Sequence, residues 1–208
     1  MDDPARLIGA NAREVRAGER DGKPVTTVTT ARDYDTDAKD LWNALTDPER
    51  IPRWFLPITG ELKPGGRYQF VGNAGGTIET CRPPQTVAVT WEFGAQTSWV
   101  TVTLEPQGDR TRLILEHTLP VDDHWKTYGP GAVSVGWDLA LFGLGRHLGG
   151  APKVSPEAAM EWMQSDEAKD LMRGSSEAWL EAWLASGAAP QDAREVAART
   201  TAFYTGGA

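Results

Sequence analysis

Near-regular alternation of apolar and polar residues between residues 65 and 119 is the feature that most limits how this chain can fold. Five short segments alternate in this way, and the turn-forming runs "NAGG", "RPPQ", "GAQT" and "PQGDR" separate them. Consecutive strands joined by short turns pair as antiparallel neighbours. The sequence therefore predicts a five-stranded antiparallel meander, with strands at 65–72, 75–81, 85–93, 98–106 and 111–119.

The alternation also assigns side chains to the two faces of this sheet, because successive residues of a strand point to opposite sides. The apolar register of the third strand comprises Val87, Val89, Trp91 and Phe93. The corresponding register of the last strand comprises Leu113, Leu115, His117 and Leu119. In the fourth strand Val100 and Val102 take the inward positions, which turns Trp99 outward. One face of the sheet is therefore apolar and needs a cover.

The residues before the meander predict a hairpin and two short helices. The hairpin spans 12–34 with an Asp-Gly turn, which is a strong hairpin signal. A helix follows, capped by Asp35, Thr36 or Asp37. A second short helix starts at Asp47-Pro48, since proline suits the first helical position.

A long apolar segment with four glycines, residues 131–148, supplies the cover. As a helix it has large apolar residues on one face and an adjoining stripe of small ones: Ala132, Gly136, Ala140 and Gly143. Asp138 lies in a narrow polar strip and is expected to face solvent. Each interior glycine costs about 1 kcal/mol relative to alanine. The stripe therefore either allows close approach of a backbone or leaves room for a ligand.

The remaining residues, 151–208, show helix signals and no strand signals. Helices are predicted to open at Ser155-Pro156, at Ser165-Asp166 and at Pro190. This extension either covers the outer side of the long helix or forms an interface with a second copy or another protein. The predicted organisation is a domain over residues 1–150 and a helical extension over 151–208 packed on it.

Composition and charge exclude several classes of function. The net charge of −8 disfavours nucleic acid and anionic membranes as partners. Cys81 is the single cysteine, and the spacing of the three histidines matches no metal site, so neither a metal nor a cofactor is expected. The start of the chain is charged and lacks an apolar signal core, which favours a cytoplasmic protein. Nine tryptophans indicate aromatic clusters, a cavity or an apolar interface.

An ordered set of motifs carries a family resemblance: "LWNALTDPERIPRWF", "LKPGGRYQF", "TWEF", "VTVTLEPQGDRTRLILEHT", and "GW" in the long helix. Over about residues 25–150 the chain resembles the START-like or SRPBCC superfamily, in particular the homologues of the activator of the heat-shock chaperone ATPase. The resemblance implies a helix-grip (START-like, Bet v-like) α+β fold, in which a curved antiparallel sheet wraps a long C-terminal helix around a cavity. Such relatives include binders of lipids, polyketides or hormones, cyclases, hydratases and chaperone activators. The glycine-rich stretch before the long helix and the helical extension depart from this pattern.

The predicted function is therefore binding of a small, largely hydrophobic ligand between sheet and helix. The expected lining residues are Trp54, Phe55, Tyr68, Phe70, Trp91, Trp99, His117, Gly136, Trp137, Ala140 and Gly143. The alternative to a cavity is that the aromatic residues fill the core.

His117 is the single catalytic candidate, either as a general base or as a group that orients a ligand, and its alternative is a structural role. Glu116 points to the opposite face, so no acid–base pair forms, which weighs against an enzyme. A cyclase or hydrolase that uses His117 and a protein-interaction module like the chaperone activators are the alternative functions.

Overall fold

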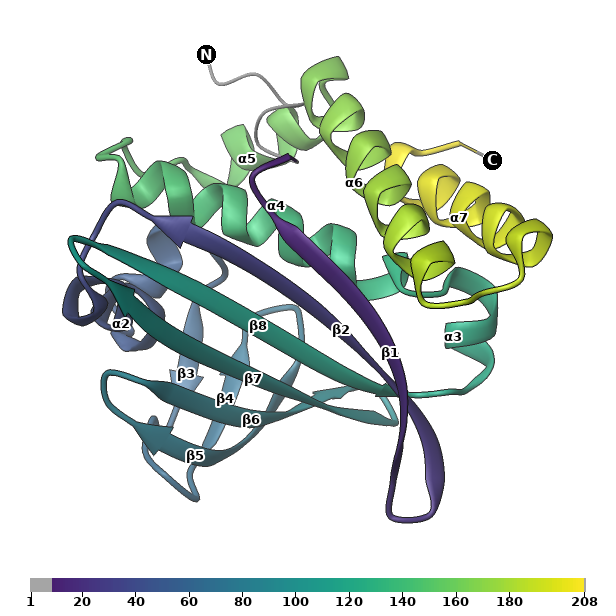
Figure 1. Cartoon of the computed structure of the whole chain (residues 1–208). Coiled ribbons are helices and arrows are strands. Elements are labelled where there is room, and N and C mark those ends of the chain that lie inside the picture. Colours follow the sequence, from purple (N-terminus) through teal and green to yellow (C-terminus); the bar gives the residue numbers. More distant parts are fainter. Residues whose placement is uncertain (1–8, 208) are drawn as a thin grey trace. The chain divides into compact units, whose positions relative to one another are not determined.

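The computed structural model describes residues 9–207; the charged start of the chain, residues 1–8, lies outside the described part. Eight strands form one sheet in the order β1-β2-β8-β7-β6-β5-β4-β3, in which neighbours from β3 to β8 pair antiparallel (Figure 1). The long helix α4 follows the sheet in sequence, and helices end the described chain. The predicted α+β class, an antiparallel sheet followed by a long helix, is confirmed.

The strands include all five of the predicted meander. They are β1 (Ala12–Arg20), β2 (Lys23–Tyr34), β3 (Ile58–Gly60), β4 (Arg67–Phe70), β5 (Gly75–Arg82), β6 (Thr86–Phe93), β7 (Gln96–Gln107) and β8 (Arg110–Pro120). The predicted hairpin is β1 and β2, joined through Asp21 and Gly22, which both have positive φ. Such a turn matches the twist of the strands it joins. Strand β3 was not predicted, because its three residues are too few for a pattern.

The described helices are α2 (Ala38–Thr46), the 3-10 helix η1 (Ile51–Arg53), α3 (Asp123–Tyr128), α4 (Gly131–Leu148), α5 (Pro156–Met163), α6 (Asp166–Ala185) and α7 (Pro190–Thr205). Four helices, α2, α5, α6 and α7, start where the sequence predicts. Among the three candidates, Asp37 caps α2 and accepts from the amides of Lys39 and Asp40. Where a helix is predicted to start at Asp47-Pro48, the chain instead forms a turn, and the three-residue η1 begins at Ile51. Helix α3 was not predicted, and its cap is Asp122.

The chain divides into two compact units, which are described separately. The sheet unit comprises residues 31–119 and 143–153. The tail unit comprises the described residues of 1–30, 120–142 and 154–208. The predicted boundary at residue 150 stays a prediction.

In the sheet unit the two registers of β7 and β8 differ as the alternation predicts. The buried residues are Ser98, Val100, Val102 and Leu104 on β7, and Thr111, Leu113, Leu115, His117 and Leu119 on β8. On β6 the residues of both faces are half-buried, so burial does not distinguish the faces. The pairing with β7 does: Val89 lies opposite Val100, and Trp91 opposite Ser98. Phe93 is exposed, because the strand ends there at a turn.

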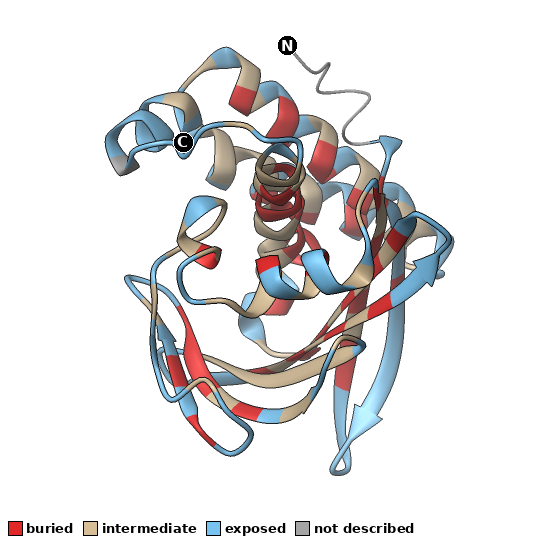
Figure 2. Cartoon of the chain, turned by 90° about the vertical axis from the view of Figure 1, so that its left-hand side faces the viewer, coloured by how far each residue is buried: buried red, intermediate tan, exposed pale blue. Residues whose placement is uncertain are grey.

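In the tail unit α4 is covered on its outer side. Val135 packs in one buried cluster with Ala168 and Met172 of α6, and Phe142 stacks on Trp162 of α5 at 5.5 Å. Figure 2 shows that α4 is buried or half-buried along most of its length. This burial follows from a helix that is apolar nearly all round.

The expectation that Asp138 faces solvent is wrong. Asp138 keeps 4% of its surface exposed and forms an ion pair with Arg13 of β1, in which Nη2 and Oδ2 are 2.9 Å apart. Ser175 Oγ and the indole N–H of Trp179, both on α6, also donate to Oδ2. The polar strip is therefore a buried contact that joins three elements of the tail unit.

Candidate functional site

Six side chains of the sheet unit form a continuous series of ring contacts, called the aromatic row: Trp54, Phe55, Tyr68, Phe70, Trp91 and His117. Consecutive ring centroids lie between 4.9 and 6.0 Å apart. Edge-to-face and offset contacts at about 4.5–7 Å are the favoured geometries for aromatic pairs. Tyr68 and His117 are buried, and the other four are half-buried. The fold thus brings together six of the predicted lining residues, from the turn after η1 and from β4, β6 and β8.

Backbone carbonyls fix two members of the row in position. The indole N–H of Trp54 donates to the carbonyl of Ala44 in α2 at 2.9 Å. The hydroxyl of Tyr68 donates across β5 to the carbonyl of Thr90 at 2.8 Å, and burial raises the pKa of this phenol. Gly76 of β5 lies between Tyr68 and Thr90, and an added Cβ atom there would clash with that same carbonyl of Thr90. Glycine is required here for the close approach of β6.

His117 is the buried end of the row. It is 1% exposed, and burial lowers the pKa of its imidazole to about 3, so the ring is neutral at physiological pH. Its Nε2 lies 2.8 Å from Ser98 Oγ, and the Ser98 hydroxyl donates to the carbonyl of Trp91 at 3.1 Å. A hydroxyl has one proton, so both bonds form together only if His117 carries its proton on Nε2 and donates it to Ser98.

In this arrangement the proton is donated in the opposite direction to that between a nucleophile and its general base. A general base must accept the proton of the serine hydroxyl, whereas here the Ser98 proton is directed to a carbonyl and the histidine is the donor. The pair can stabilise the strand pairing and present a polar end to the row. The geometry does not support His117 as an activator of Ser98.

Trp99 lies outside the row. It is half-buried on β7, where it pairs with Thr90 and Thr118 in the register opposite to that of Ser98 and Val100. This outward direction is the one that the alternation predicts. Trp99 and Trp91 are therefore two half-buried tryptophans on neighbouring strands that face opposite sides of the sheet.

The stripe of small residues on α4 is divided between the units. In the sheet unit, a Cβ atom added to Gly143 would lie 2.6 Å from the carbonyl oxygen of Trp54, so glycine allows close backbone approach there. In the tail unit, a Cβ atom on Gly136 would lie 3.5 Å from the Tyr204 hydroxyl, an ordinary contact. Ala140 is buried and Trp137 half-buried. These three tail-unit residues stay predictions as ligand contacts.

A cavity within the tail unit is too small for an organic ligand. It has a volume of about 10 Å³, enough for one water molecule. Its lining includes Tyr128, Trp179, Trp183 and Val196. Among the described residues no group of three or more His, Cys, Asp or Glu side chains could hold a metal ion, and no helix is long and apolar enough to cross a bilayer.

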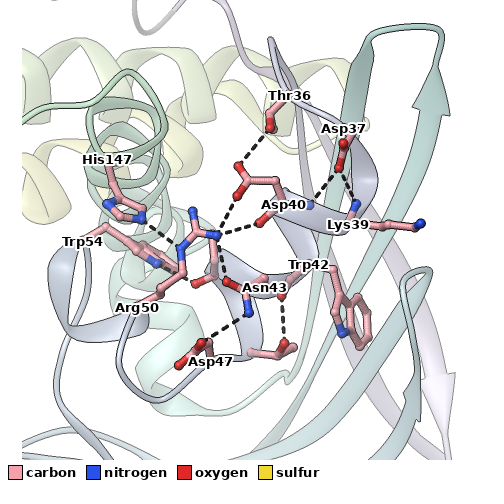
Figure 3. Close-up of polar contacts among 12 residues, drawn as sticks. Thr36, Asp37, Lys39, Asp40, Trp42, Asn43, Asp47, Arg50, Trp54 and His147 are labelled. Carbon is pink, nitrogen blue, oxygen red and sulfur yellow. Dashed lines mark hydrogen bonds and ion pairs between the residues drawn. The ribbon is translucent and has the colours of Figure 1, made fainter.

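Sequence reasoning missed a polar network beside the row. Arg50, the residue before η1, donates to Asp40 and Asn43 of α2 and to His147 near the end of α4 (Figure 3). Nothing in the spacing of these residues indicates their contact. Ser98, by contrast, could have been found, because it is the one polar residue in the inward series with Val100 and Val102.

Comparisons with known proteins agree with this fold. The family model of the activator of Hsp90 ATPase homolog 1-like protein matches residues 35–149, more than half of the chain. The crystal structure of CalU16 from Micromonospora echinospora is 31% identical, with a TM-score of 0.64, and the match covers 85% of this chain and 98% of CalU16. Its solution NMR structure gives a TM-score of 0.69 at 31% identity, covering 86% and 95%.

A more distant protein shares the fold alone. EF2215 from Enterococcus faecalis, a conserved protein of unknown function, is 18% identical with a TM-score of 0.58, covering 86% of this chain and 95% of that one. Comparison with curated protein sequences gives no match.

Proposed function

The chain belongs to the family of activator of Hsp90 ATPase homolog 1-like proteins, and we propose that it binds a small, largely apolar molecule against the aromatic row. The observation that supports this is the row itself, in which four half-buried rings continue to a buried polar end at His117. Ligand sites are mostly apolar and contain few polar groups. The row has this composition.

The polar groups of the row favour binding over chemistry. Trp54 and Tyr68 donate to backbone carbonyls, and the proton of Ser98 is directed to Trp91. These donors already have acceptors within the protein, so the rings offer mainly their faces to a ligand. A cyclase or hydrolase that uses His117 gains no support from this arrangement. A protein-interaction role, through the C-terminal helices or in a homodimer, stays a prediction.

Two tryptophan substitutions test the proposal. A neutral apolar fluorophore, Nile red, would be titrated into the full chain and into the variants Trp91→Leu and Trp99→Leu. We expect Trp91→Leu to weaken binding by about tenfold or more, because a buried aromatic contact carries about 1–2 kcal/mol of binding energy. The matched variant Trp99→Leu, on the opposite face, is expected to keep its affinity within about twofold.

Urea denaturation of both variants would show that each still folds. Equal losses of affinity in the two variants, or no loss in Trp91→Leu, would contradict binding at the row. Native mass spectrometry of protein purified from its source would then identify any retained molecule.

A further inference from the structure

Within the sheet unit, the guanidinium group of Arg50 connects α2 with the last turn of α4. Nη1 donates to Asp40 Oδ1 at 2.7 Å and to Asn43 Oδ1 at 2.8 Å, both on α2. Nε donates to His147 Nε2 at 3.3 Å, in the last turn of α4 (Figure 3). Thr36 Oγ1 completes the network by donating to Asp40 Oδ2 at 2.9 Å.

The bond between Arg50 and His147 exists in one protonation state only. Arginine has donors but no acceptor and keeps its charge, so His147 must offer a bare Nε2 and carry its proton on Nδ1. A second proton would occupy Nε2, remove the acceptor and place two cations 3.3 Å apart. The contact is therefore present with neutral His147 and lost with the imidazolium.

The groups around His147 set the direction in which its pKa shifts. Partial burial, followed by the charges of Arg50 and Arg53, lowers the pKa of His147, whereas Asp40 on α2 opposes the shift. Two cations and one carboxylate thus act on a histidine whose ordinary pKa is near 6.5, so its imidazolium forms below that pH.

The same turn of α4 also touches the aromatic row. Trp54 follows Arg50 at the end of η1, and its carbonyl oxygen lies where a side chain on Gly143 would clash. Residues 143 and 147 are four apart and so share one helix face. The end of α4 therefore holds the segment from Arg50 to Trp54 at two points, a glycine contact and a hydrogen bond.

We propose that His147 is a pH-sensitive positioning residue for the aromatic row. Neutral His147 accepts from Arg50 and keeps Trp54 in place for a ligand. Protonated His147 repels Arg50, which stays bonded to Asp40 and Asn43, so the segment from Arg50 to Trp54 loses its hydrogen bond to α4 and binding weakens. The proposal rests on the proposed function for its effect on affinity, but not for the conformational step.

The experiment compares the full chain with His147→Gln and His124→Gln. Glutamine accepts from Arg50 through Oε1 and does not titrate, whereas His124 is an exposed histidine of the tail unit and serves as the matched control. Nile red affinity would be measured between about pH 7.5 and about pH 5. We expect affinity to fall on the order of tenfold in the wild type and in His124→Gln, and to stay nearly constant in His147→Gln.

A second readout separates this proposal from the proposed function. The indole N–H of Trp54 donates to Ala44, so its ¹H–¹⁵N NMR signal, assigned with Trp54→Phe, reports whether the segment is held. The signal is expected to change with the titration of His147 in the wild type and not in His147→Gln.

A wild-type signal or affinity that does not change across this pH range would overturn the proposal, as would a His147→Gln variant that behaves like the wild type. Absence of Nile red binding at every pH would contradict the proposed function alone, since the Trp54 signal still tests the conformational step.

Discussion

His117 in the sheet unit and Asp138 in the tail unit are both buried, but they are accommodated differently. His117 gives up its charge: burial lowers its pKa to about 3, and its Nε2 lies beside the hydroxyl of Ser98. Asp138 is matched by the Arg13 guanidinium and by N–H and O–H donors. A neutral buried group suits a surface that meets an apolar molecule, whereas a matched buried charge suits a fixed junction between elements.

The difference has a physical basis in the cost of desolvation. Burying an unpaired charge is far more expensive than burying a hydrogen-bonded neutral group. The tail unit offsets that cost with a bidentate Arg13, whose Nε and Nη2 both donate to Asp138 Oδ2. The buried contact of Asp138 therefore depends on every one of its partners being present. The sheet unit avoids the cost by keeping the histidine neutral.

The largest effect is expected from breaking the ion pair of the tail unit. Arg13→Met should lower the free energy of unfolding by about 3–5 kcal/mol, because it leaves the carboxylate of Asp138 buried without its cation. Urea denaturation measures this change. The control is Arg16→Met on the same strand, where the pair with Glu14 is exposed and 3.9 Å long; its effect should stay within about 0.5 kcal/mol. Similar losses in the two variants would contradict a special role for Asp138.

A pH titration of stability tests the neutral histidine. The folded-state pKa of His117 lies below its unfolded value, so the unfolded chain takes up the proton first and acid destabilises the fold. From pH 6.5 downward, the wild type should lose about 1.4 kcal/mol per pH unit more than His117→Gln, whose amide can still donate to Ser98. Urea midpoints at several pH values measure the difference. Parallel curves for the two proteins would show that His117 is protonated in the folded state or is not buried.

The smallest effects come from removing one indole N–H in each unit. Trp179 donates to the carboxylate of Asp138 at 3.1 Å, and Trp54 donates to the backbone carbonyl of Ala44 at 2.9 Å. Hydrogen bonds to charged groups contribute about 1.5–3 kcal/mol and those between neutral groups about 0.5–1.5 kcal/mol. Trp179→Phe should therefore destabilise more than Trp54→Phe. Thermal unfolding of both variants measures the order, and the reverse order would contradict the comparison.

The candidate site was predictable where one strand's pattern was enough. Alternation places His117 inward on β8 and Trp99 outward on β7, and in the structure each side chain lies on the predicted face. The same reasoning could not find Arg50 and His147, which are far apart in the sequence and belong to elements whose packing has no local signal. The burial of Asp138 was not predictable either, because its partners lie on β1 and α6, far from it in the sequence.

The sequence by itself determined most of the elements and their order, with β3 and α3 as exceptions. Turn residues, capping residues and the alternation depend only on residues that are close together in the sequence. Their effect on the backbone is therefore the same wherever the segment lies in the fold. The tertiary structure alone decided which side chains meet: Ser98 with His117, Arg50 with His147, and Arg13 with Asp138. These contacts depend on long-range packing, since a polar residue is buried or exposed according to partners that its own segment does not contain.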